Sequence, residues 1–205
     1  MPKFDLSLAI SSEPLTDFSW ADVFGEERAA LPVELEIGTG KGAFLLRRAL
    51  ALPDRNFLGI EWANEFYRYA ADRMARRGAT NVRMLRAEAS LFMRQTCPRD
   101  SLAALHVYHP DPWPKKRHHK RRLFQLAFVE AAISCLKSGA RWAIQTDHAE
   151  YFAQIRSLLM GHSQLIEAPF DDPAWSVDGA RLGTNFEVKY IAEGRPIHQI
   201  AFTRR

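Results

Sequence analysis

The sequence has little cysteine and no long apolar run. Its 205 residues include only two cysteines, Cys97 and Cys135, which lie 38 positions apart without a CxxC spacing. This spacing argues against a disulfide framework or a zinc site and is typical of reduced thiols in a cytoplasm. No apolar run approaches the roughly 18 residues of a membrane-spanning helix, and the N-terminus lacks the layout of a signal peptide. We therefore expect a cytoplasmic protein with no membrane segment and no metal.

Basic residues only slightly outnumber acidic ones, and their excess comes from one segment. The net charge is +4, and residues 115–122 hold six of the 28 basic residues and no acid. Without that octapeptide, 22 basic residues face 24 acidic ones. The hydrophobic share of 47% and the charged share of 25% are ordinary for a globular chain and argue against disorder. The sequence therefore predicts a slightly acidic body with one basic octapeptide suited to nucleic-acid phosphates.

Apolar runs alternate with amphipathic stretches from residue 31 onward. Seven runs predict strands, at residues 33–37, 56–61, 82–86, 102–109, 141–147, 163–170 and 196–205. Four stretches predict helices, at residues 43–52, 63–77, 121–137 and 184–193. The alternation is typical of an α/β protein with a doubly wound, mostly parallel sheet. We expect one domain over residues 31–205, closed by an antiparallel strand at the sheet edge, and a segment 1–30 without a clear element.

A glycine-rich loop follows the first predicted strand and opens the first predicted helix. Gly38, Gly40 and Gly42 allow a tight turn and the close approach of a ligand at the positive end of a helix. Glu61 ends the next strand, where an acid accepts hydrogen bonds from ribose hydroxyls. The letters GTGKGA also satisfy the dinucleotide fingerprint, but they do not match a phosphate-binding P-loop, which needs Ser or Thr after Gly-Lys.

Two further carboxylates distinguish between the possible ligands of this loop. Glu36 lies two residues before the first glycine, where it would repel a pyrophosphate but suits a cationic ligand. Glu88 follows the third strand. With Glu61 and the glycines, these acids look like the site of a class I S-adenosylmethionine (SAM) methyltransferase. Strand-end acids beside an ordinary turn are the alternative.

A proline-rich motif follows the fourth predicted strand, at the end of the sheet where ligands bind in open α/β folds. Prolines flank Asp111 on both sides and fix the backbone that aims its carboxylate. The basic octapeptide begins at Lys115, so cations that could bind nucleic-acid phosphates lie close to the Asp111 carboxylate. Trp113 either stacks on a base or packs within the protein.

Taken together, these motifs resemble the bacterial tRNA (guanine-N7-)-methyltransferase family over about residues 31–205. The resemblance rests on the segments ELEIGTGKG, FLGIE, HPDPWPKKRHHKRR, QTD and TNFE. It implies a SAM-dependent enzyme that methylates N7 of the guanosine at position 46, in the variable loop of tRNA. Guanine N7 carries a lone pair and no hydrogen, so the reaction needs no general base and depends on positioning and electrostatics.

The resemblance also implies roles for individual residues. Asp111 is the catalytic candidate, and the cofactor would contact Glu36, Gly38, Gly40, Gly42, Glu61, Glu88 and Asp111. The substrate would face Lys115, Asp147, Thr184, Asn185, Phe186 and Glu187. RNA phosphates would meet Lys116, Arg117, Lys120, Arg121 and Arg122. From the residues alone, Asp147 is equally a candidate cap for a following helix, and Thr184 with Glu187 has the spacing of a capping box.

Two other functions remain open at this point. Asp111-Pro-Trp113 is similar to the Asp-Pro-Pro-Tyr loops of amino-group methyltransferases, which would make adenine N6 the target. A non-catalytic RNA-binding relative is the second alternative. Segment 1–30 has two cations and six acids, so we expect the main RNA contacts beside Asp111 and not at the start of the chain. No pattern in the sequence distinguishes a monomer from a homodimer.

Overall fold

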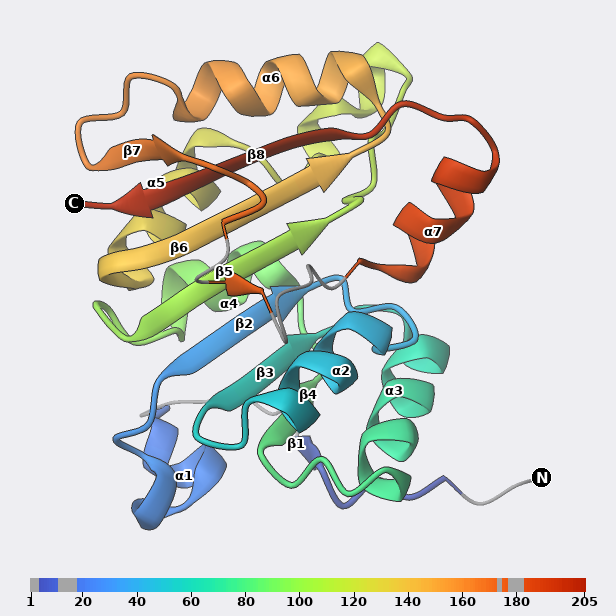
Figure 1. The fold of residues 1–205 in the computed structure, drawn as a ribbon. Coiled ribbons are helices and arrows are strands. Elements are labelled where there is room, and N and C mark those ends of the chain that lie inside the picture. Colours follow the sequence, from blue (N-terminus) through green and yellow to red (C-terminus); the bar gives the residue numbers. More distant parts are fainter. Residues whose placement is uncertain (1–3, 11–17, 173–174, 177–182) are drawn as a thin grey trace.

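The core of the fold is a sheet with helices on both faces. Figure 1 shows it in a computed structural model that describes residues 4–10, 18–172, 175–176 and 183–205, without the side chains of residues 185, 186 and 188. The described strands are β1 (Ala9–Ile10), β2 (Val33–Ile37), β3 (Asn56–Ile60), β4 (Val82–Leu85), β5 (Leu102–Tyr108), β6 (Leu136–Thr146), β7 (Leu165–Ala168) and β8 (His198–Arg204). The described helices are α1 (Trp20–Phe24), η1 (Glu26–Arg28), α2 (Ala43–Ala51), α3 (Asn64–Arg76), α4 (Ala89–Gln95), η2 (Lys116–Arg121), α5 (Leu126–Cys135), α6 (Ala149–Leu159) and α7 (Asn185–Ala192).

The strand order places a switch point at the middle of the sheet. The order is β1-β4-β3-β2-β5-β6-β8-β7, and the strands from β1 to β6 pair in parallel. Because β2 pairs with β3 on one side and with β5 on the other, the chain winds outward in both directions from it. Ligands of such sheets bind at the carboxyl ends of the strands beside this point. The predicted fold class, a doubly wound and mostly parallel sheet, is confirmed.

The C-terminal strand differs from expectation in its position. β8 is antiparallel to its neighbours, as predicted, but it lies between β6 and β7, and β7 forms the edge. The predicted edge position was therefore wrong. Ile200, Ala201 and Phe202 are all buried, which fits a strand that is paired on both sides and not one with a solvated edge.

Several helical elements differ from the prediction. The helix predicted from residue 121 begins at Leu126, because Lys116–Arg121 form the short 3-10 helix η2 and the chain then runs extended into α5. The sequence pattern did not identify α4 and α6. The segment 1–30, which gave no clear pattern, contributes β1, α1 and η1 to the described structure. Among the described residues, no helix has both the length and the apolarity to cross a membrane.

The two faces of the sheet carry different side chains. One face packs Leu35, Leu105 and Trp142 into an apolar core under α4, α5 and α6. The opposite face, toward the viewer in Figure 1, is apolar only under α2 and α3, where Phe57 and Met84 are buried. Beyond those helices it becomes polar. The buried polar side chains there are Glu34, Glu36, His106, Arg141 and Gln145.

The centre of this polar face is the carboxylate of Glu34, which is fully buried. His106 Nε2 lies 2.9 Å from one oxygen, Arg55 donates to the other at 3.0 Å, and Arg48 donates to both. Arg48 also donates to the backbone carbonyl of Trp175 at 2.9 Å. Burial alone would raise the pKa of Glu34, but the hydrogen bonds from His106 and Arg48 outweigh it and hold the pKa at about 2. The network ties β2 to α2, to β5 and to the chain after β7.

The first prediction concerns stability against acid. Because the pKa of Glu34 in the folded protein is about 2, against an ordinary value of 4.5, the ionised carboxylate stabilises the fold above about pH 4.5. That stabilisation is lost as the pH falls toward 2. Glu34→Gln is expected to lower the free energy of unfolding at pH 7 by about 3 kcal/mol. Its unfolding free energy should then change less than that of the wild type between pH 4.5 and 2.

Urea denaturation at a series of pH values measures both effects. Glu27→Gln, an exposed substitution of the same kind, is the control and should follow the wild type. An acid limb of the Glu34→Gln curve as steep as that of the wild type would contradict the proposed ionisation.

Candidate active site at the carboxyl ends of the strands

The chain brings its chemically distinctive side chains to one edge of the sheet. The parallel strands β2, β3, β4, β5 and β6 all end there. The residues that follow them are the glycine loop, Glu61, Glu88, Asp111 and Asp147. Residues far apart in the sequence therefore border one region, in agreement with the arrangement expected from the strand pattern.

The glycine loop is folded back onto the end of β3. Gly38 N–H donates to the Ile60 carbonyl at 2.8 Å, and Gly40 N–H donates to Glu61 Oε2 at 2.8 Å. All three glycines have positive φ angles, between 52° and 75°, a region that other residues rarely adopt. A Cβ on Gly42 would lie 2.6 Å from Met74 Cε and 3.2 Å from Ala70 Cβ, so only glycine lets α2 begin this close to α3.

Glu36 is a buried carboxylate with an unused oxygen. The residue is 3% exposed, and within the described part of the chain its Oε2 has no hydrogen-bond partner. The backbone amide of Leu45 donates the hydrogen bond that the carboxylate does have. Burial, together with the nearby charge of Glu61, raises the pKa of Glu36 well above its usual value. A cationic group at this position would supply the missing counter-charge.

Two of the other acids, Glu61 and Glu88, already accept hydrogen bonds from backbone amides. Glu61 accepts from Gly40 N–H and, through Oε1, from Ala63 N–H at 2.9 Å, so it orders the glycine loop. Glu88 is the N-cap of α4, where it accepts from the amides of Ser90 and Leu91 at 2.9 and 2.7 Å. A carboxylate has about four acceptor positions, so these bonds leave each acid able to accept from a ligand as well.

The segment after β5 turns sharply around Asp111. His109 and Trp113 both have left-handed backbones, with φ of 52° and 42°, a conformation that is uncommon for residues other than glycine and clusters at functional sites. Asp111 is exposed between them. Trp113 is half-buried: its ring meets His118 edge-on at 5.8 Å, and the Arg121 guanidinium lies 5.0 Å from it.

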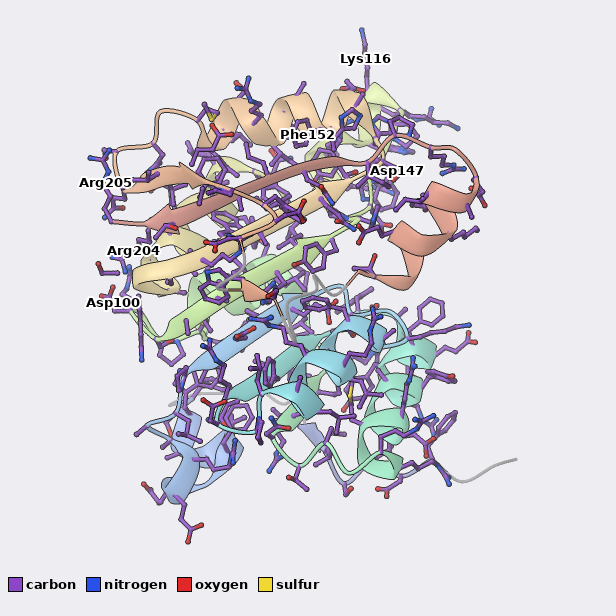
Figure 2. The ribbon with its side chains drawn as sticks, viewed as in Figure 1. Asp100, Lys116, Asp147, Phe152, Arg204 and Arg205 are labelled. Atoms are coloured by element: carbon purple, nitrogen blue, oxygen red, sulfur yellow. The ribbon has the colours of Figure 1, made fainter. Side chains whose placement is uncertain are left out.

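The basic octapeptide splits into exposed cations and one buried cation. Lys115, Lys116, Arg117, Lys120 and Arg121 are exposed, and Figure 2 shows Lys116 pointing away from the body of the protein. Arg122 is only 2% exposed. It donates to the Pro112 carbonyl at 2.8 Å, to Gln154 at 2.6 Å and to Glu150 at 3.2 Å. Unlike the expectation from the sequence, the Arg122 guanidinium is therefore turned inward, and it fastens the Asp111 segment to α6.

Helix α7 begins with the capping box that the sequence predicted. Thr184 Oγ1 accepts from Glu187 N–H at 3.0 Å, and Glu187 Oε2 accepts from Thr184 N–H at 3.3 Å. Gln145 of β6 reaches the same two side chains at 3.5 and 3.4 Å, which sets the start of α7 against the sheet. The side chains of Asn185 and Phe186, which the sequence places toward the substrate, lie outside the described residues.

The other end of α7 is fastened near Asp147. Asp147 accepts from Arg195 at 3.0 Å and lies 3.5 Å from His109 Nδ1. Burial lowers the pKa of His109, and the neighbouring Asp147 opposes that shift. Tyr190 of α7 meets the His109 ring edge-on at 5.1 Å. Asp147 is not the helix cap considered from the sequence, since His148 occupies the N-cap of α6 and accepts from Tyr151 N–H.

Sequence reasoning missed the residues that hold α7 in place. Gln145 is the first residue of the QTD segment, two positions before Asp147. The sequence placed it at the end of a strand but did not indicate that it contacts Thr184 and Glu187. Arg195 lies 48 residues from Asp147 in a segment without any motif. Arg47 of α2, which donates to the Gly183 carbonyl, gave no signal either.

One cavity lies outside this region. A cavity of about 680 Å³ opens at the amino ends of the strands, with Cys97, Asp100, Glu130 and Arg204 among its lining residues. Figure 2 shows Asp100 and Arg204 at the end of the sheet opposite Asp147. Among the described residues, no group of three or more His, Cys, Asp or Glu side chains could hold a metal ion.

Comparisons with known proteins agree with this geometry. A family model described as "Putative methyltransferase" matches residues 30–200. The structure of TrmN from Thermus thermophilus superposes with a TM-score of 0.60 at 18% identity, over 90% of this chain and 48% of that one. The family match over most of the chain identifies a methyltransferase, and the doubly wound sheet is shared with that solved structure.

Curated relatives give the particular family. The chain is 38% identical to the tRNA (guanine-N(7)-)-methyltransferase of Bordetella pertussis over 184 residues, which cover 90% of this chain and 70% of that protein. It is 33% identical to the enzyme of the same name from Geobacter metallireducens over 92% of this chain and 88% of that protein. The chain belongs to the tRNA (guanine-N(7)-)-methyltransferase family, and the resemblance seen in the sequence is confirmed.

The second prediction separates two adjacent arginines. Arg122→Ala is expected to lower the free energy of unfolding by about 2–3 kcal/mol, because it leaves the Pro112 carbonyl and Gln154 without their charged donor. Arg121→Ala removes the same charge from an exposed position and should change stability by less than about 0.5 kcal/mol. Urea denaturation of the two variants side by side measures the difference. Equal stabilities would show that the buried contacts of Arg122 do not hold the Asp111 segment.

Proposed function

We propose that this chain transfers a methyl group from SAM to N7 of a guanosine in tRNA, at position 46 of the variable loop. One observation carries the proposal. The proline-flanked Asp111 stands at the end of β5, next in the sheet to the strand of the acidic glycine loop, and the exposed cations of η2 follow it directly. A cationic donor and an anionic RNA would thus meet at the same residue.

The cofactor side of the site fits a cationic donor. Glu36 offers a buried carboxylate oxygen that has no partner among the described residues, which suits a sulfonium or an ammonium group. Glu61, fixed by two backbone amides, would accept from ribose hydroxyls, and Glu88 would accept from the donor's amino groups. Gly38 and Gly40 would leave the backbone before α2 open to the close approach of the cofactor, and Gly42, packed against α3, would fix the start of the helix beside it. When bound there, SAM supplies an electrophilic methyl group on its sulfur.

The substrate side needs no proton transfer. The lone pair of guanine N7 would take the methyl group as the bond between that methyl group and the donor's sulfur breaks, so the positive charge would pass from the sulfur to the purine. The carboxylate of Asp111 would accept from guanine donors and stabilise that charge. Lys115, Asp147 and the segment Thr184–Glu187 would complete the pocket. The bonds from Gln145 and Arg195 support this assignment, because they fix α7 and Asp147 relative to the strand ends.

The phosphates of the RNA would meet the exposed cations of the octapeptide. These are Lys116, Arg117, Lys120 and Arg121, without Arg122, whose guanidinium is engaged inside the protein. Trp113, packed against His118 and Arg121, would support these cations from beneath. We place the activity in the cytoplasm, where tRNA is found and where Cys97 and Cys135 stay free thiols.

The third prediction tests the reaction itself. Purified protein with unmodified tRNA and labelled SAM is expected to form 7-methylguanosine at one position. Borohydride reduction and aniline cleavage locate that position, and nucleoside analysis identifies the product. N6-methyladenosine in place of 7-methylguanosine would instead identify an amino-group methyltransferase. SAM and tRNA binding without any product would identify a non-catalytic relative.

Asp111→Ala should reduce the rate of methyl transfer by about a hundredfold or more, because it removes the charge beside the reacting purine. Asp54→Ala, at an exposed position just before β3 and so at the other end of the strands, is the control and should keep the wild-type rate. Full activity of Asp111→Ala would disprove the role assigned to this carboxylate.

The fourth prediction concerns the protonation of Glu36. Its raised pKa means that the carboxyl of the free protein keeps its proton to a higher pH than an ordinary glutamate, and a cationic ligand favours the ionised form. Where the carboxyl is still protonated, binding of SAM should therefore release a proton, and affinity should increase as the pH rises above the ordinary value of 4.5, by at most about tenfold per unit. In Glu36→Gln that increase should disappear. Calorimetry at several pH values measures it, and the same pH dependence in both proteins would contradict the assignment.

A further inference from the structure

Helix α3 exposes aromatic rings beside the glycine loop. Trp62, directly before the helix, is 65% exposed, and Phe66 and Tyr69 are 39% and 43% exposed. Phe66 and Tyr69 are three positions apart and share one face of the helix, and the buried face is formed by Ala70, Ala71 and Met74. The core therefore does not account for these rings.

Cations accompany each end of this row of rings. Arg86 lies 5.7 Å from the Trp62 ring and donates to the Trp62 carbonyl at 3.2 Å. Lys41 of the glycine loop lies 5.8 Å from the Tyr69 ring. Arg73, four positions after Tyr69 on the same face, donates to the Lys41 carbonyl at 3.1 Å. We call these six residues the α3 strip: Lys41, Trp62, Phe66, Tyr69, Arg73 and Arg86.

The α3 strip and the basic helix η2 lie on opposite sides of the candidate site. In Figure 1, α3 lies low on the edge where the strands end and α7 lies above it, and Figure 2 shows Lys116 of η2 at the top of the same edge. Lys41 joins the strip to the glycine loop itself. A large anionic substrate that reaches Asp111 from the η2 side would therefore extend across the site toward α3.

We propose that the α3 strip is a second tRNA-binding surface, on which unstacked bases lie against Phe66 and Tyr69 while the cations meet phosphates. The proposal rests on the function proposed above. Aromatic faces interleaved with cations are the combination that binds single-stranded and looped RNA without reading its sequence. The strip carries three cations, and Glu65 is the one acid in the first turn of α3 beside it, so the excess of positive charge favours RNA over an apolar protein partner.

The acidic start of the chain favours such a surface on physical grounds. Residues 1–30 hold two cations and six acids, and the Asp5 amide donates to Asp72, on the part of α3 farther from Trp62. This segment therefore repels RNA there, and η2 lies on only one side of the site. A guanine presented for methylation must be held while its tertiary contacts are open, and that state exposes neighbouring bases. A stacking surface across the site from the phosphate contacts would stabilise it.

The fifth prediction tests the strip with a double variant, Phe66→Ala with Tyr69→Ala. Trp62, Lys41 and Arg73 stay unchanged, because they adjoin Glu61 and the glycine loop. The Kd for unmodified tRNA, measured by filter binding, should rise by about tenfold, and the Kd for SAM, measured by calorimetry, should stay unchanged. Ile166→Ala, a 50% exposed side chain on the edge strand β7, is the control.

The possible results separate this inference from the proposed function. If the wild type forms 7-methylguanosine and the double variant binds tRNA as tightly as the wild type does, the α3 strip does not bind tRNA and the proposed function stands. If tRNA binding depends on the strip but no 7-methylguanosine forms, the function fails and the strip stands. If the double variant changes only the molecular mass in solution, the rings belong to a protein interface and the RNA surface is overturned.

Discussion

The buried ion pair between Glu34 and Arg48 is the interaction on which the arrangement of the site depends. It joins β2 to α2, and through Arg48 it also holds the chain after β7, which leads to α7. Glu36 lies two residues further along β2 and points to the same face. It is also buried, but one of its oxygens has no partner among the described residues. One strand thus carries a carboxylate whose charge is compensated by His106 and two arginines, and a second carboxylate with an oxygen that is left for a ligand.

Periodicity predicted the sheet because buried strands and amphipathic helices have different repeats. It failed where tertiary contacts decide the structure. The helix predicted from residue 121 lacks its first turn: the 3-10 helix η2 ends at Arg121, Arg122 is drawn inward to Pro112 and Gln154, and α5 begins only at Leu126. Strand β8 is internal because β7 pairs with it, which no local pattern reveals.

The candidate site divides in the same way. The glycines and strand-end acids were predictable, since parallel strands end at one edge. The difference between Arg121 and Arg122 was not, because adjacent letters of one basic run carry no sign of burial. Likewise, contacts such as Gln145 to Thr184 or Arg195 to Asp147 join segments that are 39 and 48 residues apart, and only the fold brings them together.

Methylation at a nitrogen that already has a free lone pair places unusual demands on a protein. No residue has to move a proton, so the gain in rate must come from alignment and charge. This explains why so much of the structure serves to fix segments and so little is reactive. Asp111 is exposed on a backbone held by two left-handed residues and by Arg122, and α7 is fastened at both ends. With cations on η2 and rings on α3 at the two sides, the substrate would be aligned by the same edge of the sheet that aligns the donor.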